Sequence, residues 1–166
     1  MNEILKIPFA AFNNDWDDLQ LFLKHKGNPP YEITDDFKDY MGSRIQSLGN
    51  LTSVGGNLNL YKSNIKSIGN LTSVGGYLDL YDCTNLTSLG NLTSVGGSLD
   101  LSESKVESLV NLTSVGGSLN LSGTQIKSLG NLTSVGGNLD LRDTPLSKKY
   151  TKEEIRKIVK VGSNII

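Results

Sequence analysis

The seven-residue stretch NLTSVGG at Asn50–Gly56 decides how this chain folds, because it occurs five times without a change. The other copies are Asn70–Gly76, Asn91–Gly97, Asn111–Gly117 and Asn131–Gly137. Successive units that contain it are spaced by 20, 21, 20 and 20 residues. A fixed period of this length is typical of a solenoid, in which each coil buries its apolar side against its neighbours. Catalysis needs a given residue only once, so we expect the invariant residues to build a scaffold and the variable residues to carry the function.

Within each unit, two patterns of apolar residues predict the local structure. The segment GNLNLYK at Gly56–Lys62 alternates, with Leu58 and Leu60 on one side, which predicts a short, half-buried strand. The apolar residues from Ile65 to Val74 are spaced by about three and predict a return arc that is extended or forms short 3-10 turns. We expect the Gly-Gly pair to give the chain the free backbone angles of a sharp corner. Stacked coils then form one parallel sheet, with these leucines inside: Leu60, Leu80, Leu101, Leu121 and Leu141.

The pattern L-x-L-x-x-[ST]-x-I, repeated every 20 or 21 residues from about Lys38 to Arg142, resembles leucine-rich repeats. It is most similar to the short repeats of bacterial and bacteriophage proteins. The resemblance implies an α/β solenoid that binds other proteins through exposed strand residues. One departure is that the family usually has Asn where this chain has Ser63, Cys83, Ser104, Thr124 and Thr144. We expect Asn50 and its counterparts to take over part of that asparagine's hydrogen bonding.

Both ends carry helix signals, and we expect them to cap the solenoid within one domain, residues 1–166. Residues 1–37 form the N-terminal helical cap, with Asn14 or Asp15 as N-cap and Gly27 as the stop. Residues 38–147 form the repeats, beginning with a degenerate coil in which Tyr40 takes the position of Leu121. Residues 148–166 form the C-terminal cap, with a capping box at Thr151–Glu154 and a last strand near the end of the chain.

Composition limits the classes of partner and compartment. The formal net charge is −1, which disfavours nucleic-acid binding and mimicry of a nucleic acid. The single cysteine allows no disulfide within the chain, and the N-terminus does not look like a secretory signal. No segment is apolar enough to cross a membrane. We therefore expect a cytoplasmic protein, located in the host cytoplasm if a phage encodes it. Residues 1–42 have a net charge of −4 and residues 148–166 of +4, which favours weak head-to-tail self-association.

The sequence gives little support to an enzyme. It has one histidine, His25, one cysteine, Cys83, and no metal-ligand spacing or nucleophile motif. Asp79 and Asp100 fall on neighbouring coils, close enough to share a cation. However, they belong to a regular column of Asp and Asn, which is more typical of a solvated sheet face. The segment GGNLDL has a superficial likeness to a calcium-binding nonapeptide, but that motif repeats every nine residues. We expect no enzymatic activity, cofactor or metal.

The strand positions that face away from the core vary between units, and tyrosines gather on the first two full coils. Tyrosine is enriched in protein interfaces, and acidic residues surround these tyrosines. The predicted protein-binding residues are Tyr61, Tyr77, Asp79, Tyr81, Asp82, Asp100, Glu103, Asp140 and Arg142. The function that follows is a scaffold that binds another protein, as an inhibitor or adaptor acting on a host protein. Two alternatives stay open: a structural or assembly module such as a virion component, and a face that is merely solvated, with tyrosines shielding the sheet.

Overall fold

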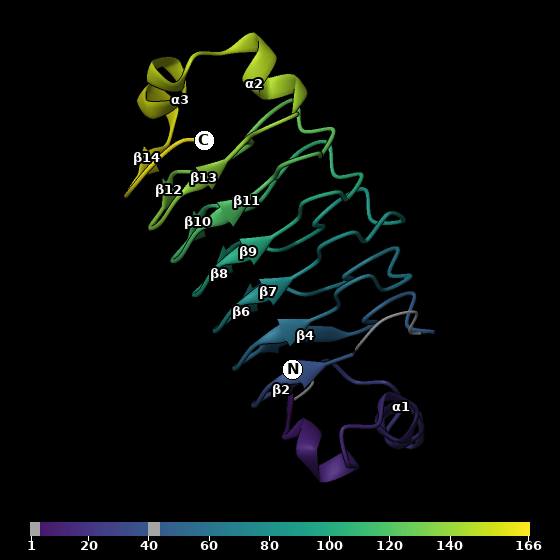
Figure 1. The fold of residues 1–166 in the computed structure, drawn as a ribbon. Coiled ribbons are helices and arrows are strands. Elements are labelled where there is room, and N and C mark those ends of the chain that lie inside the picture. The colour runs from purple at the N-terminus through teal and green to yellow at the C-terminus, as the bar shows by residue number, and fades with distance from the viewer. Residues whose placement is uncertain (1–3, 40–43) are drawn as a thin grey trace.

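The computed structural model describes residues 4–39 and 44–166, and it shows a parallel β-solenoid (Figure 1). Each unit of about 20 residues makes one coil, and the coils stack along one axis from α1 (Trp16–His25) to α3 (Lys152–Ile158). The repeat architecture expected from the fixed period is therefore confirmed. The remaining helices are short: η1 (Phe9–Phe12) near the N-terminus and α2 (Pro145–Lys149) after the last full repeat.

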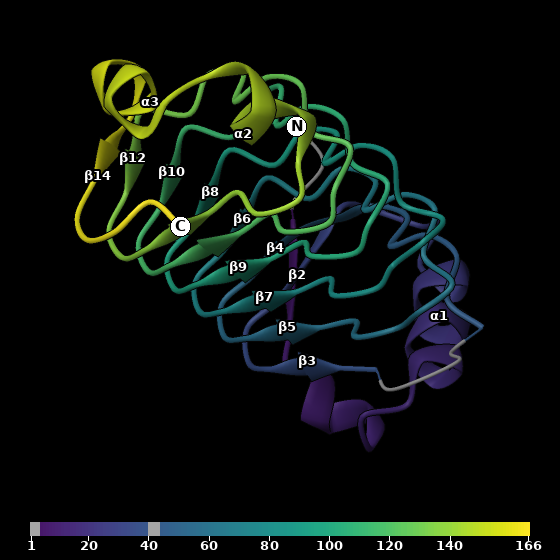
Figure 2. The same cartoon turned by 45° about the horizontal axis from the view of Figure 1, so that its top comes forward.

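Two parallel sheets run along the solenoid, so the expectation of a single sheet is wrong. Within the described residues, sheet A has eight strands, in the order β1 (Leu5–Ile7), β2 (Tyr31–Ile33), β4 (Leu51–Val54), β6 (Ser73–Val74), β8 (Ser94–Val95), β10 (Ser114–Val115), β12 (Ser134–Val135) and β14 (Lys160–Val161). Sheet B has six strands in the same part of the chain, in the order β13 (Leu139–Asp140), β11 (Leu119–Asn120), β9 (Leu99–Asp100), β7 (Leu78–Asp79), β5 (Leu58–Asn59) and β3 (Phe37–Lys38). Figure 2 shows the two sheets meeting along one edge of each coil.

Sheet A replaces the irregular return arc that the sequence predicts. The Ser and Val of NLTSVGG form a short strand that aligns with the same two residues of the next coil. Ser73 is opposite Ser94, and Val74 is opposite Val95. The threonine before each pair adds a side-chain ladder: the Thr93 hydroxyl donates to the Thr72 carbonyl at 2.9 Å, and the same bond recurs in every full repeat. The invariant stretch is therefore a strand of a sheet, joined to its neighbours by backbone and side-chain hydrogen bonds.

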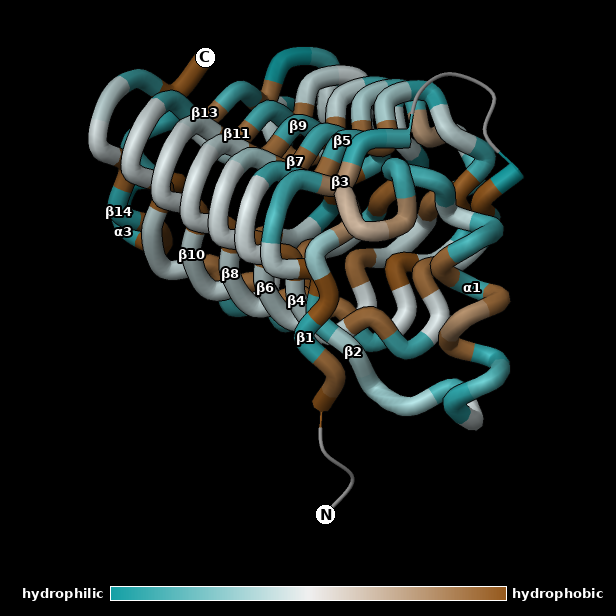
Figure 3. The backbone as a smooth tube through the Cα atoms, turned by 90° about the horizontal axis from the view of Figure 1, so that it is seen from below, coloured by the Kyte–Doolittle hydropathy of each residue, from teal (hydrophilic) through white to brown (hydrophobic). Residues whose placement is uncertain are grey.

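The Gly-Gly pair sits at the corner between the two sheets, but its role differs from the one expected. None of these glycines has a positive φ; the positive values fall elsewhere, as at Gly69 (φ 62°). What requires glycine is the close approach of stacked coils, seen as adjacent pale arcs in Figure 3. A Cβ added at Gly75 would lie 2.2 Å from the carbonyl oxygen of Gly55, and one at Gly116 would lie 2.0 Å from that of Gly96. Glycine is therefore required at this corner by the lack of space between coils, not by an unusual backbone angle.

The core lies between the two sheets and the remaining side of each coil, as an unbroken column of aliphatic side chains. The five leucines predicted to stack inside are all buried, with Leu60 and Leu101 completely inaccessible. Beside them runs a second buried column, which holds the hydroxyls and the thiol of Ser63, Cys83, Ser104, Thr124 and Thr144. Thr124 donates to the carbonyl of Leu121 at 2.6 Å, and Cys83 donates to the carbonyl of Leu60 at 3.1 Å. Thr124 and Cys83 thus satisfy backbone carbonyls inside the coil, whereas the buried hydroxyl of Ser104 has no hydrogen-bond partner among the described residues.

Two members of the Asn column donate to backbone carbonyls of the preceding coil. The Asn50 side chain donates to the carbonyl of Asn28 at 2.8 Å, and Asn111 donates to that of Gly90 at 2.9 Å. Asn70 instead donates to the side chain of Asn50 at 3.2 Å. These bonds join neighbouring coils on the exposed side of the solenoid.

Strands at both ends of the chain extend the two sheets beyond the regular repeats. At the N-terminal end, β1 and β2 add to sheet A and β3 adds to sheet B, inside or beside the segment expected to be a helical cap. Tyr40, expected at the position of Leu121, lies outside the described residues. At the C-terminal end, β14 joins sheet A and Ile165 bridges to Leu139.

The helices begin as their sequences predict. The Asp15 side chain accepts hydrogen bonds from the backbone N–H groups of Asp17 and Asp18, which identifies it as the N-cap of α1. The capping box of α3 is present in full: Thr151 accepts from the N–H of Glu154, whose carboxylate accepts from the N–H of Thr151. Leu19 and Leu23 of α1 are buried, and Trp16 stacks on Phe37 of β3 with ring centroids 5.2 Å apart.

One residue departs from the repeat in a way that predicts a stabilising change. Val110 occupies the position that is Gly49, Gly69, Gly90 and Gly130 in the other units, and it has a φ of 39°. A β-branched residue is strained in this left-handed region. Val110→Gly is therefore expected to raise the free energy of unfolding by about 1 kcal/mol and the melting temperature by about 2–4 °C. Thermal unfolding measures this, with Gly90→Val as the reciprocal control that should lower it. A loss of stability in Val110→Gly would contradict the strain.

Candidate functional site

The candidate site is the outer face of sheet B, which carries the residues that differ between units. The strands of sheet B pair in register. The residue that follows the first inward apolar residue of each strand therefore lies in a column along the sheet. That column is Lys38, Asn59, Asp79, Asp100, Asn120 and Asp140. Neighbouring members are separated by about one strand spacing, 4.8 Å. This column therefore holds Asp or Asn at every step after Lys38.

The Asp and Asn residues of this column have a backbone role that the sequence analysis missed. In each full repeat, the side-chain oxygen accepts a hydrogen bond from the N–H two residues later. Asp79 accepts from Tyr81 and Asp100 accepts from Ser102 in this way, at 3.0 and 2.9 Å. The residue after the turn then takes a positive φ, as Lys62 and Asp82 do. These are Asx turns that end each strand of sheet B, and the recurrence of Asp or Asn at a fixed step before the turn was the signal for them.

Of the three tyrosines that the sequence predicts to cluster, Tyr61 and Tyr81 stack on each other. Their rings stack with centroids 5.2 Å apart and planes inclined by 12°. The ammonium group of Lys62 lies 5.2 Å from the centroid of Tyr61 and 5.8 Å from that of Tyr81. A cation at this distance is attracted to the face of an aromatic ring. The pKa of Lys62 is raised above its usual value. The main cause is a hydrogen bond with the Tyr61 hydroxyl, and the negative charge of nearby groups adds to it.

Tyr77 belongs to a second part of the same face. Its hydroxyl donates to Asp79 Oδ2 at 2.5 Å, while Asp79 Oδ1 holds the Asx turn, so both carboxylate oxygens are engaged. Asp79 is consequently well buried, with 8% of its surface exposed. Asp100 pairs with Asp79 in the sheet register, and its Oδ2 accepts from Asn120 at 3.3 Å. The two carboxylates that sequence analysis considered for a cation are thus already bonded to protein groups.

Asp140 and Arg142 lie at the other end of the sheet, separated from Asp100 by the strand of Asn120. Arg142 donates to Asp140 through its Nε and Nη2 atoms, and its backbone N–H also donates to Asp140 Oδ1. Burial alone would raise the pKa of Asp140, but these bonds outweigh it and lower the pKa below the usual value. This pair neutralises itself and does not join the tyrosine cluster. Of the predicted residues, the structure brings together those from Tyr61 to Glu103 and places Asp140 and Arg142 apart.

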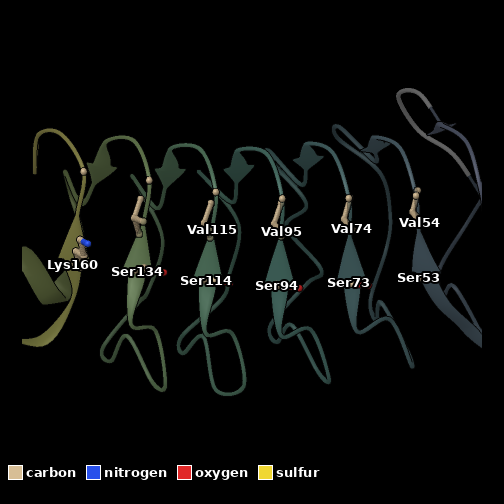
Figure 4. Close-up of a pocket in the computed structure, with 17 residues that line it drawn as sticks. Ser53, Val54, Ser73, Val74, Ser94, Val95, Ser114, Val115, Ser134 and Lys160 are labelled. Carbon is tan, nitrogen blue, oxygen red and sulfur yellow. The ribbon is translucent and has the colours of Figure 1, made fainter.

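A second surface, which sequence analysis did not single out, lies on sheet A. A shallow groove of about 750 Å³ runs across strands β4 to β14 (Figure 4). Serines, glycines and the backbone of the inward valines line it, and Lys160 closes one end. The signal in the sequence is the invariant Ser-Val-Gly, which the repeat pattern alone attributes only to the scaffold. The groove has smooth walls of small residues, in contrast to the varied face of sheet B.

The chemistry available elsewhere in the described residues is limited. Burial raises the pKa of the Cys83 thiol, which keeps it protonated and unreactive. Residues 4–39 and 44–166 contain no group of three or more His, Cys, Asp or Glu side chains arranged to hold a metal ion. Within the same residues, none of the helices combines the length and apolar character that a membrane span requires.

Comparison with known proteins gives no further guide. The chain matches no protein family, no curated protein and no solved structure.

Proposed function

We propose that this chain is a non-enzymatic protein-binding scaffold of the leucine-rich-repeat kind, which binds its partner on the outer face of sheet B. The observation that carries the proposal is the stacked pair Tyr61 and Tyr81. The equivalent positions in the later coils hold Ser102, Ser122 and Arg142, so the stacking of coils does not require aromatic rings there. An interface concentrates large, rigid aromatic side chains at one point, whereas a general shield for the sheet would recur in every coil.

The chemistry of the face favours a partner with basic groups. Asp82 lies on the coil of Tyr81, Asp100 and Glu103 lie on the next coil, and within the described residues none of the three forms an ion pair. Lys62 lies over the rings and offsets only part of this charge. Acidic groups at the rim of an interface act mainly on the rate and salt dependence of association, while the aromatic pair supplies most of the affinity.

The helices at the two ends support the scaffold in this proposal by covering the terminal coils. Leu19 and Leu23 of α1 and Ile155 of α3 are buried against the ends of the core. A solenoid with uncovered ends would expose its apolar column to water or to other chains. With the ends covered, sheet B is the varied surface that remains for a partner. An inhibitor or adaptor acting on a host protein would use such a face.

The double substitution Tyr61→Ala/Tyr81→Ala tests the proposal. It is expected to leave the melting temperature nearly unchanged and to weaken partner binding by about 1–3 kcal/mol, because both residues project from the sheet. Tyr150→Ala is a matched control: Tyr150 is also half-buried beneath a lysine, with Lys149 at 5.0 Å from its ring, but it lies at the C-terminal end.

The measurement is affinity capture from a lysate of the source organism with wild-type, double-mutant and control baits, followed by calorimetry with the captured protein. The proposal expects a protein retained by the wild-type and Tyr150→Ala baits and lost by the double mutant. Equal retention by all three baits would place the binding surface away from the tyrosines.

An assembly module is the second candidate, and one observation favours it. Residues 148–166 hold six basic and two acidic residues, while the N-terminal end is acidic. Each end also exposes a large apolar side chain, Leu21 in α1 with 55% of its surface exposed and Ile158 in α3 with 60%. A head-to-tail contact between copies would join these ends and would be open-ended. Oligomers that grow beyond a dimer at low salt would support it.

A further inference from the structure

The outer face of sheet A has an invariant residue that the fold does not explain. The serines of this face are Ser53, Ser73, Ser94, Ser114 and Ser134. Within the described residues, their hydroxyls make no hydrogen bond that the structure records, whereas the threonines beside them form the ladder between coils. The glycines beside them are required because a Cβ would strike the next coil. Coil stacking thus accounts for the threonine and the glycine but not for the serine.

Outward positions on the two sheets differ in how much they vary between units. The outward positions of sheet B have diverged between units, from Asn57 to Tyr77 to Ser98 in one column, although the same units share the Ser of sheet A without a change. The serine is unchanged in five copies, while another surface position in the same copies varies, and this contrast indicates a constraint from outside the coil. A contact that needs a flat, small-residue surface along the whole sheet would impose this constraint.

Charges mark the two ends of the same row. In the register of sheet A, Ser53 pairs with Glu32 and Glu32 with Lys6, while at the other end Ser134 pairs with Lys160. The row therefore reads Lys, Glu, five serines, Lys. No ion pair of Glu32 or Lys160 occurs within residues 4–39 and 44–166. An acid near one end and a base at the other make the row complementary to a reversed copy of itself.

We propose that two copies of this chain associate through the outer faces of sheet A, antiparallel, with a two-fold axis at Ser94. Glu32 lies three strands from Ser94 on one side and Lys160 three strands away on the other. A two-fold axis at Ser94 thus places Glu32 against Lys160 of the partner subunit, and forms that ion pair twice. The parallel alternative would oppose like charges at both ends, which costs free energy.

The dimensions predict a weak dimer. The row from Glu32 to Lys160 spans six strand spacings, about 29 Å at 4.8 Å each. A strip of this length and a few residues wide is smaller than the roughly 800 Å² per partner that a stable interface buries. Small side chains compensate by letting the two sheets approach closely, and the two symmetric ion pairs set the register. The shallow groove of about 750 Å³ on each copy lies within the proposed contact. Sheet B is left free, so a dimer would present two binding faces.

Sedimentation velocity of the full chain over about 10 µM to 1 mM tests the proposal. Ser94→Arg places a bulky charge against its own symmetry mate and is expected to weaken dimerisation by about tenfold or more. Thr84→Arg adds the same side chain at an exposed position off both sheets and should leave the dimer unchanged. The melting temperatures of both variants, measured at low concentration, establish that each is folded. A sample that stays monomeric at 1 mM, or a Ser94→Arg variant that dimerises like the wild type, overturns the proposal.

A charge exchange tests the antiparallel register. Glu32→Lys and Lys160→Glu are each expected to weaken dimerisation by about tenfold, because each opposes two like charges in the dimer. The double variant Glu32→Lys/Lys160→Glu restores opposite charges and is expected to recover the wild-type dimer. If both single variants dimerise normally, or if the double variant fails to recover, the antiparallel pairing is wrong. Oligomers larger than a dimer that are insensitive to Ser94→Arg would assign the association to the ends of the solenoid.

Discussion

Gly116→Ala is expected to lower the free energy of unfolding by about 3 kcal/mol, although it adds a single methyl group. The new Cβ would lie 2.0 Å from the carbonyl oxygen of Gly96 and 2.9 Å from its carbonyl carbon. Both are backbone atoms, held on either side by the hydrogen bonds that join the coils, as from the N–H of Gly116 to the carbonyl of Val95. The two coils cannot relax without breaking these ladders. Denaturant unfolding monitored by circular dichroism measures the loss.

The matched control is Gly49→Ala, because a Cβ at Gly49 has no atom within 4 Å but the residue has a φ of 58°. This variant isolates the cost of a left-handed alanine, about 1 kcal/mol. If Gly116→Ala costs no more than Gly49→Ala, the invariance of the corner glycines does not come from the close approach of coils.

Leu101→Ala is expected to lower the free energy of unfolding by about 2–5 kcal/mol, the range for a buried leucine whose removal leaves a cavity. The side chain of Leu101 is completely buried in the column between Leu80 and Leu121. Coils on both sides are held in register by their backbone ladders, so they cannot collapse to fill the space. The expected cost therefore lies in the upper half of that range.

Leu21→Ala provides the comparison, because Leu21 belongs to α1 but has 55% of its surface exposed. Its expected cost is about 0.5 kcal/mol or less. The same unfolding experiment measures both variants. A cost for Leu101→Ala as small as that for Leu21→Ala would show that the inward column does not form the core.

Sheet B was predictable from the sequence, whereas sheet A was not, and the reason lies in the length of the strands. The segment at Gly56–Lys62 alternates over several residues, so its period identifies a strand and its inward side. In β6, only Ser73 and Val74 pair with the next coil, and two residues are too few to show any period. The spacing from Leu71 to Val74 therefore predicts an irregular arc. The pairing of those residues is visible only when the coils are stacked.

The candidate site divides in the same way. The tyrosines and acids of sheet B could be grouped from the sequence, because register in a repeat follows from counting residues. The sequence could not predict that Tyr61 stacks on Tyr81 while Tyr77 bonds to Asp79, because these contacts depend on side-chain rotamers in three dimensions. The row from Glu32 to Lys160 could not be found either, because Glu32 and Lys160 lie outside the regular repeats and enter the sheet only through pairing.

By itself, the sequence determined that this chain is a solenoid of stacked coils with leucines inside, because a period of 20 residues leaves each coil too small to bury its apolar side alone. The tertiary structure decided why the residues between those leucines are invariant. Thr72 is a ladder donor, and Gly75 is glycine because the Gly55 carbonyl leaves no room for a Cβ. Both reasons are contacts between residues about 20 positions apart, and only the distance between stacked coils turns them into constraints.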